Sequence, residues 1–273
     1  KYFKSKPEMV FSQKKISPQV ESDAKVTKVF DLNINFYPKD DDYSAKALLV
    51  YDLESNRTLF EKNADQKTFI ASLTKMATTK IIADEYSLNE IRSISAESAK
   101  YNGSALELKE NQIFTMRDLL KAAVISSSNQ SVYAMQDPAK SVQEMNDYAK
   151  TLRLKNTSFS NPAGFDDDQN YSTAEEIVPI AKLFFGNDLL LEFSGTAKSD
   201  IYDISESKRL RVNTTNDLVK LGNEYVIGGK TGTTQLAAQN LVLLVEKNKK
   251  RYIIIILNSI ERYKDAEKVL ARI

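Results

Sequence analysis

Three short patterns of residue types in this chain could together carry nucleophilic chemistry. They are Ser72 with Lys75, Ser127 with Asn129, and the triplet Lys-Thr-Gly that begins at Lys230. A serine hydroxyl beside a lysine amine is an activated-nucleophile arrangement, provided that the lysine is neutral. The ordinary pKa of lysine is about 10.4, so burial or a second nearby cation must lower it before the amine can act as a base near pH 7. A buried second lysine, such as Lys230, would have that effect.

Each pattern alone also has an ordinary structural interpretation. Ser72 could cap a helix with Lys75 as a surface charge, and Ser127 and Asn129 could form a polar helix end. A lysine at the start of a strand, where we expect Lys230, is usually a solvated end. Ser-x-x-Lys occurs four times, but only Ser72 opens an amphipathic helical pattern that would hold serine and lysine on one face. The joint occurrence of the three patterns, each on the expected type of element, favours one shared site.

The composition narrows the chemistry further. The 273 residues include no histidine and no cysteine. A Ser-His-Asp triad, a Cys-His dyad and the usual histidine- or thiolate-bearing zinc sites are therefore excluded. A general base in this protein must be Lys, Asp, Glu or Tyr.

The formal net charge of +1 argues against a nucleic-acid-binding protein, which needs a strong basic bias. No run approaches the roughly 18 consecutive apolar residues of a membrane-spanning helix. The chain begins with Lys1 rather than Met, so we expect that a preceding segment was removed, such as a signal peptide or a membrane anchor.

Strand-like segments stand at both ends of the chain, with helical segments between them. Residues 46–53 and 57–63 read as one β-hairpin, and residues 240–246 and 251–259 read as another, before a closing helix over 261–273. We expect the terminal strands to meet in one antiparallel sheet. The mostly helical stretch over about 90–220 would be inserted between them, which predicts an α/β protein of the α+β type. Residues 1–42 read as a polar arm and residues 43–273 as the catalytic domain.

The helical segments show recurring apolar residues and helix-start signals. Leu73, Met76, Ala77 and Ile81 fall on one helical face. Further helices are expected over residues 115–125, 141–154 and 172–185. Pro179 lies inside the last of these and should kink or shorten it. Residues 203–212 read as a charged connection.

Together with these three patterns, two longer stretches carry a family resemblance. They are "LKNTSFSNPAGFDDDQNYSTAEEI" over 154–177 and "NTTNDLV" over 213–219. Over roughly residues 45–273 the chain resembles the serine D-alanyl-D-alanine carboxypeptidases, the low-molecular-weight penicillin-binding proteins. This resemblance implies a β-lactamase/transpeptidase-like fold, with an antiparallel sheet flanked by helices and an inserted helical subdomain. It implies no metal and no cofactor.

The resemblance also implies a role for each residue of the three patterns. Ser72 would attack the carbonyl between the two terminal D-alanines of a cell-wall stem peptide, and Lys75 would take its proton. Ser127 would relay a proton to the leaving amine, while Asn129 would hold the side chains and the substrate amide. The implied anchors of the substrate are Lys230 and Thr231 for its terminal carboxylate, Gly232 for close approach of its backbone, and the N–H groups of Ser72 and Thr233 as oxyanion hole.

Three alternatives stay open at this point. A serine β-lactamase shares the three patterns, and its class A members carry a glutamate base in an E-x-x-L-N loop. The string "EYSLN" at 85–89 comes too soon after Ser72 for that loop, and "DDDQN" at 166–170 fits the peptidase pattern better. A D,D-endopeptidase of the same family and a non-catalytic binding protein on this fold are the other two.

Departures from the family pattern include Ile70 where proline is frequent, Gln130 where an acidic residue is common, and Ala238 where glycine is frequent. None of them removes a catalytic group. The implied partners are a peptidoglycan stem peptide ending in D-Ala-D-Ala and β-lactams as covalent inhibitors, with no nucleic acid. The implied location is extracytoplasmic, with membrane attachment, if any, through a segment that is not in this chain.

Overall fold

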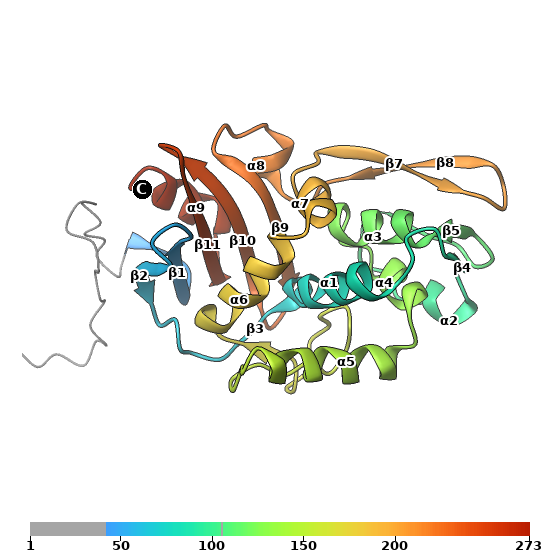
Figure 1. Cartoon of the computed structure of the whole chain (residues 1–273), viewed down its shortest axis with the longest axis horizontal. Coiled ribbons are helices and arrows are strands. Elements are labelled where there is room, and N and C mark those ends of the chain that lie inside the picture. Colours follow the sequence, from blue (N-terminus) through green and yellow to red (C-terminus); the bar gives the residue numbers. More distant parts are fainter. Residues whose placement is uncertain (1–41, 105) are drawn as a thin grey trace, which may run out of the picture.

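The computed structural model describes residues 42–104 and 106–273, and its largest sheet has five antiparallel strands in the order β2-β1-β11-β10-β9 (Figure 1). The strands are β1 (Ala47–Asp52), β2 (Arg57–Lys62), β9 (Val226–Thr234), β10 (Ala238–Lys247) and β11 (Lys250–Ser259). β1 pairs with β11, with Ala47 opposite Leu257. The predicted meeting of early and late strands in one antiparallel sheet is therefore confirmed. The predicted arm lies outside the described residues, apart from Asp42.

Both faces of this sheet are covered. Helix α9 (Arg262–Leu270) contacts β10 and β11, while α6 (Ala174–Phe185) contacts β1 and β11. Side chains alternate between the two faces of a strand. Accordingly, Ile254 and Ile256 belong to the apolar cluster with α9, and Ile253 and Ile255 belong to the larger cluster with the other helices. This double coverage explains the uninterrupted aliphatic run in β11.

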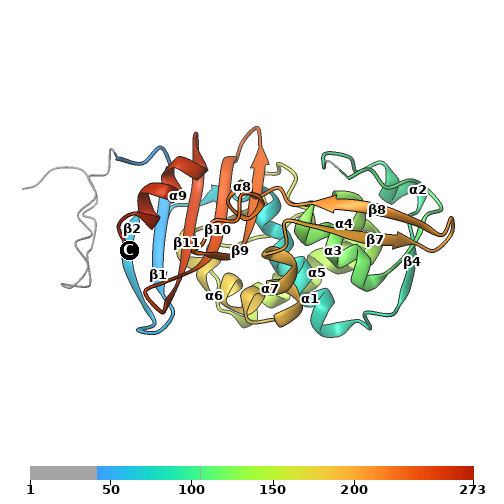
Figure 2. The same ribbon diagram turned by 90° about the horizontal axis from the view of Figure 1, so that it is seen from above.

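The remaining helices form a lobe beside the sheet (Figures 1 and 2). They are α1 (Lys75–Glu85), α2 (Ala96–Ala99), α3 (Met116–Ile125), α4 (Asn129–Met135), α5 (Pro138–Thr151) and α7 (Asp188–Ser194), while α8 (Asp217–Lys220) packs on β9 in the same apolar cluster as α9. Two small antiparallel pairs accompany them, β3 (Thr68–Phe69) with β6 (Tyr171–Ser172) and β4 (Ile91–Ser93) with β5 (Ile113–Thr115). The predicted helix starts at residues 115 and 173 are confirmed, because Thr115 and Thr173 each accept a hydrogen bond from the backbone N–H three residues later.

Three local expectations are corrected. The charged connection predicted at 203–212 is part of a β-hairpin of β7 (Lys198–Asp203) and β8 (Lys208–Asn213), which runs along the lobe (Figure 2). Its lysine and arginine side chains are exposed, so the composition of the segment hid the strand pairing. Pro179 does not shorten α6, which runs on to Phe185. Pro179 has no N–H, so it cannot donate the helical hydrogen bond to the carbonyl of Glu175, and the helix continues without that bond.

The third correction concerns Lys230. It does not open the apolar strand but lies inside the preceding one, β9, and a short turn separates β9 from β10. Its side chain is only 1% exposed, so it is not a solvated strand end. The two strands pair side by side, with Lys230 opposite Val242.

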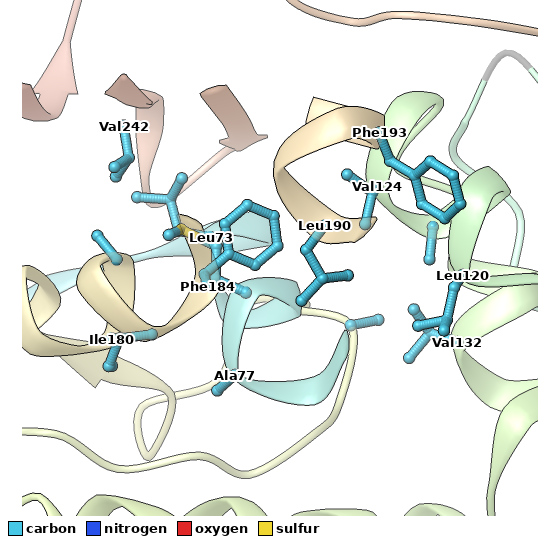
Figure 3. Packing of buried hydrophobic residues seen from close by; sticks show 14 of the residues in the cluster. Leu73, Ala77, Leu120, Val124, Val132, Ile180, Phe184, Leu190, Phe193 and Val242 are labelled. Atoms are coloured by element: carbon cyan, nitrogen blue, oxygen red, sulfur yellow. The ribbon is translucent and has the colours of Figure 1, made fainter. Parts of the chain in front are cut away.

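The core joins the sheet to the lobe through α1 and its neighbours. Leu73 and Phe184 pack together with Leu190, and Val124 and Phe193 extend this packing toward α3 (Figure 3). All five side chains are buried. The segment that carries Ser72 therefore sits on a rigid support from three sides.

Candidate active site

Ser72 lies in a 3₁₀ turn, Ala71–Thr74, that leads directly into α1. In a 3₁₀ turn, side chains three residues apart stack above one another. This places the Lys75 Nζ 2.8 Å from the Ser72 Oγ. The expected helical start at Ser72 is therefore a tighter turn than an α-helix, and the pairing of Ser72 with Lys75 follows from it.

The Lys75 amine is buried, with 1% of the residue exposed, and it has three polar neighbours. Besides Ser72, its Nζ lies 2.7 Å from Asn129 Oδ1 and 2.6 Å from the carbonyl oxygen of Ala163. Two of these neighbours are oxygens that can only accept. A neutral amine has two N–H donors and one lone pair. With both donors on these oxygens, the lone pair faces the Ser72 hydroxyl.

The charge state of Lys75 agrees with this arrangement. Burial is the largest cause that lowers its pKa well below the ordinary value, and the positive charge of Lys230 lowers it further. The sequence predicted that burial or a second nearby cation would lower this pKa, and both are present around Lys75. The geometry and the charge together make Lys75 a candidate general base for Ser72.

Ser127 and Lys230 form a second pair. The Lys230 Nζ lies 2.8 Å from Ser127 Oγ and donates to the Thr231 carbonyl at 2.9 Å. Ser127 stands between α3 and α4 with φ +56°, a left-handed conformation that is unusual for serine and is held by its surroundings. Burial, followed by the charge of Arg262, lowers the pKa of Lys230 to about 7.

Strand β9 passes very close to the nucleophile turn. A Cβ atom on Gly232 would lie 2.9 Å from the Ile70 carbonyl oxygen and 3.0 Å from the Ser72 backbone nitrogen. Only glycine allows this approach. It brings the β9 backbone alongside the Ser72 N–H, as a pair of backbone donors on one substrate oxygen would require.

A loop over residues 161–170 closes the site opposite β9. A Cβ on Gly164 would lie 1.9 Å from the Ala71 carbonyl oxygen, and Gly164 has φ +88°. Asn161 Oδ1 accepts from the backbone N–H groups of Gly164 and Phe165, at 2.7 and 2.9 Å. The loop is thereby fixed with the Ala163 carbonyl on Lys75.

Asn129 and Gln130 attach the site to the segment before α3. Asn129 Nδ2 donates to the Asn102 carbonyl at 2.8 Å, while its oxygen receives Lys75. Gln130 is buried and bonds to the Ala99 carbonyl and to both backbone groups of Leu108. A neutral amide can donate and accept in this way, and a carboxylate could not. This is a physical reason for a glutamine at position 130, where an acidic residue was expected from the family pattern.

Thr231 and Thr233 lie on β9 beyond Lys230. Thr231 is buried and shares a hydrogen bond with Thr215 at 2.5 Å. Thr233 is exposed and accepts from the Arg262 guanidinium at 2.8 Å. The polar groups at this end of the strand are cationic or hydroxylic, which suits an anionic ligand.

The structure thus brings the expected residues into two neighbouring pairs on three segments. Sequence reasoning missed two contributors, the Ala163 carbonyl and Arg262. Ala163 lies within residues 154–177, but every residue has a backbone carbonyl, so the residue type does not reveal which carbonyl contacts Lys75. No grouping of three or more Asp or Glu side chains that could hold a metal ion occurs in the described part of the chain.

Comparisons with known proteins give a consistent result. The profile of the D-alanyl-D-alanine carboxypeptidase family, peptidase family S11, matches residues 34–261. The D-alanyl-D-alanine carboxypeptidase DacF of Bacillus subtilis is 29% identical over 80% of this chain and 58% of its own length. DacC of Escherichia coli, with the same description, is 30% identical over 83% of this chain and 60% of its own. A Pseudomonas aeruginosa protein described as D-alanyl-D-alanine endopeptidase is 25% identical over 83% of this chain and 75% of its own length.

Solved structures share the fold. A single-residue mutant of the Streptomyces K15 DD-transpeptidase superposes with a TM-score of 0.80, covering 86% of this chain and 98% of that one at 24% identity. The predicted fold class is confirmed by this likeness. The chain spans about 60% of the length of the two carboxypeptidases compared above.

Proposed function

This chain belongs to the D-alanyl-D-alanine carboxypeptidase family, peptidase family S11, and on that premise we propose that it removes the terminal D-alanine from peptidoglycan stem peptides through an acyl-enzyme on Ser72. The observation that carries the proposal is the buried Lys75 amine, which lies 2.8 Å from Ser72 Oγ with both of its N–H donors taken up by carbonyl-type oxygens.

The acylation step starts from this pair. The Ser72 oxygen attacks the carbonyl of the penultimate D-alanine, and its proton passes to the Lys75 lone pair. The N–H groups of Ser72 and Thr233 receive the negative charge that develops on the carbonyl oxygen. When the intermediate collapses, the C–N bond breaks and the leaving amine takes a proton through the Ser127 hydroxyl, which Lys230 orients.

Substrate position is set by the far end of β9. The terminal carboxylate lies against Lys230 and Thr231, and Gly232 lets the peptide backbone approach the strand. Arg262 adds a cation beside Thr233. By then Lys75 has passed its first proton, through Ser127, to the leaving amine. Water attacks the ester and gives a proton to Lys75, which returns it to the Ser72 oxygen as the acyl–oxygen bond breaks, and the shortened peptide leaves as a carboxylate. The scheme needs no metal or cofactor.

Two measurements test the proposal together. Free D-alanine should appear when the protein is incubated with a pentapeptide ending in D-Ala-D-Ala. Intact mass after penicillin exposure should rise by one penicilloyl group in the wild type and stay unchanged in Ser72→Ala. If the wild type forms no adduct and releases no D-alanine, the proposal is wrong and a non-catalytic binding protein on this fold is favoured instead.

The other family activities are separable by substrate. A D,D-endopeptidase would split a cross-linked dimer faster than it releases D-alanine from a pentapeptide. A β-lactamase would turn over a chromogenic cephalosporin rapidly. Against the latter, the three aspartates at 166–168 are exposed, and Asp166 accepts from the backbone of Leu236, away from Lys75.

The substrate class sets the proposed location, which is outside the cytoplasmic membrane and facing the cell wall. None of the helices in the described ranges is both long and apolar enough to cross a bilayer. β-Lactams are the proposed covalent inhibitors, because their acyl-enzyme would form on the same Ser72.

A further inference from the structure

A groove of about 550 Å³ lies in the lobe, lined by residues from the end of α1, β4, α2 and the α4–α5 junction. A volume in this range is typical of sites for small organic ligands. None of the steps proposed above uses this groove.

The charged side chains at the groove already have partners. Arg92 is bound to Glu90, Glu97 to Lys100, and Lys140 to Glu144. Asp137 accepts the backbone N–H that caps α5. Asp137 is thus the one charge of the groove without an ion pair among the described residues, and its carboxylate is already engaged at the start of α5. No unpaired cation is left for an anionic ligand, and a neutral ligand fits better.

The groups left over are neutral donors, acceptors and aromatic rings. Tyr101 and Tyr133 stack with their ring centroids 3.5 Å apart, and both line the groove. Burial raises the pKa of Tyr133 to about 12, so its hydroxyl keeps its proton, and no described residue accepts it. Ser93 adds an exposed hydroxyl. Aromatic rings with neutral hydroxyls match the C–H faces and hydroxyl groups of sugar rings.

The groove adjoins the segments that hold Asn129 in the active site. The proposed substrate is held by its carboxylate at Lys230 and reacts at Ser72, so its remainder extends past Asn129. Tyr133 is one helical turn after Asn129 on α4, and Tyr101 precedes Asn102, whose carbonyl Asn129 binds. The aromatic stack that lines the groove is therefore next in sequence to, or one helical turn from, the residues that form the Asn129 contact.

The distances are compatible. The last residue of α4 lies about 9 Å along the helix axis from Asn129, at a rise of about 1.5 Å per residue. Four stem residues, from the sugar to the scissile bond, span at most about 14 Å when extended. An extended stem that passes Asn129 is thus long enough to bring its sugar to Tyr133 and Ala134, the groove residues of α4.

We propose that this groove binds the neutral saccharide to which the stem peptide is attached, so that the enzyme recognises glycan and peptide together. This inference rests on the proposed function for its substrate class. It assigns a second contact surface to that substrate, separate from the residues that bind its D-alanine end.

The first test is binding without catalysis. The probe is the N-acetylglucosaminyl-N-acetylmuramic acid disaccharide with its lactyl carboxylate capped as an amide, which has no peptide and no charge. Saturation-transfer NMR should detect its sugar protons with wild-type protein. Ser93→Trp, which fills the groove from an exposed position, should abolish that transfer. Ile91→Trp is the matched control, because Ile91 is also exposed, two residues earlier on the same face of β4, but does not line the groove.

The second test uses the reaction. The ratio of kcat/KM for the disaccharide-linked pentapeptide to that for the free pentapeptide should be about fivefold or more in the wild type, the value of about one net hydrogen bond. It should fall to about one in Ser93→Trp, decline in Tyr133→Phe, and stay at the wild-type value in Ile91→Trp.

The outcomes separate the two proposals. Absence of saturation transfer in the wild type, or equal transfer in Ser93→Trp and Ile91→Trp, would overturn saccharide binding at this groove. Failure to release D-alanine from either pentapeptide would instead overturn the proposed function, and the NMR result would still decide whether the groove binds the sugar.

Discussion

At the scale of single residues, the chemistry depends on one lone pair. The Lys75 amine has three polar neighbours among the described residues. Two of them, Asn129 Oδ1 and the Ala163 carbonyl, can only accept hydrogen bonds, so the lone pair faces the third, the Ser72 hydroxyl. A charged lysine would have three donors and no lone pair, and the same distances would then describe an inactive state. The activity of this site is therefore a question of protonation as much as of position.

Replacing Lys75 with arginine tests this directly. The guanidinium stays charged at every working pH and offers no lone pair. We expect the rate of acylation by penicillin to fall by at least about 100-fold. Time-resolved intact-mass measurement gives the rate, and circular dichroism establishes that the variant is folded. Acylation within tenfold of the wild type would show that another group takes the proton.

The titration of Lys230 should determine how kcat/KM falls at alkaline pH. For the free enzyme, kcat/KM with a pentapeptide should rise while Lys75 loses its proton, because the pKa of Lys75 is well below its ordinary value. It should fall above about pH 7 as Lys230 loses the charge that binds the carboxylate. In Lys230→Arg the charge persists, so the alkaline limb should move to higher pH. An alkaline limb that stays in place would assign it to another group.

Residues close in sequence were predictable, and residues that meet through the fold were not. Ser72 and Lys75 are three positions apart, so local geometry pairs them. Ser127 and Lys230 are joined only by the packing of β9 against the α3–α4 junction, and the expectation that they act together came from a family resemblance. Arg262 reaches Thr233 only because α9 starts where β11 ends, beside β9 and β10, and no pattern in the sequence encodes that contact.

At the scale of elements, the active site is a junction of a turn, a strand and a loop. The nucleophile turn at 71–74 is in contact with β9 through Gly232 and with the 161–170 loop through Gly164. Propensity and periodicity predicted the helix after the turn correctly. They could not predict the loop's path, because it is held by Asn161 and by single backbone contacts rather than by a repeating pattern.

Substitution of Gly164 by alanine tests the loop. The new Cβ would overlap the Ala71 carbonyl, and the positive φ adds strain, so we expect a loss of about 2–4 kcal/mol in the free energy of unfolding. Acylation should slow as well, because the Ala163 carbonyl would move away from Lys75.

Gly222→Ala is the matched control for this prediction. Gly222 also has a positive φ, of +68°, but a Cβ there would meet nothing within 4 Å. We expect about 1 kcal/mol of destabilisation and unchanged acylation. Urea unfolding midpoints and penicillin acylation rates measure both variants. Equal losses in both would mean that backbone strain, rather than the contact with Ala71, explains the effect at Gly164.

At the scale of the whole molecule, the site lowers stability to gain reactivity. Two lysines are buried within one cleft, where their charged forms are unfavourable. In the unfolded chain, Lys230 keeps its proton up to about pH 10.4. In the folded protein its pKa is about 7. Between these values the unfolded state binds more protons, so the free energy of unfolding should increase as the pH rises.

Urea unfolding at pH 7 and pH 9 measures this effect. Lys230 alone should contribute on the order of 2 kcal/mol of added stability at pH 9. Lys230→Met keeps a buried side chain of similar length without the titrating amine, so its gain between the two pH values should be smaller. If wild type and variant gain equally, the buried amine is not the source of the pH dependence.

The pairing of β1 with β11 has a consequence for how the protein is made. Ala47 and Leu257 are neighbours in the sheet but are separated by most of the domain along the chain. Contacts of such long sequence separation form slowly. A growing polypeptide at the ribosome cannot complete this sheet until residues 250–259 have been synthesised, because β11 is the strand between β1 and β10. The five-stranded sheet therefore stays incomplete until synthesis of the domain is nearly finished.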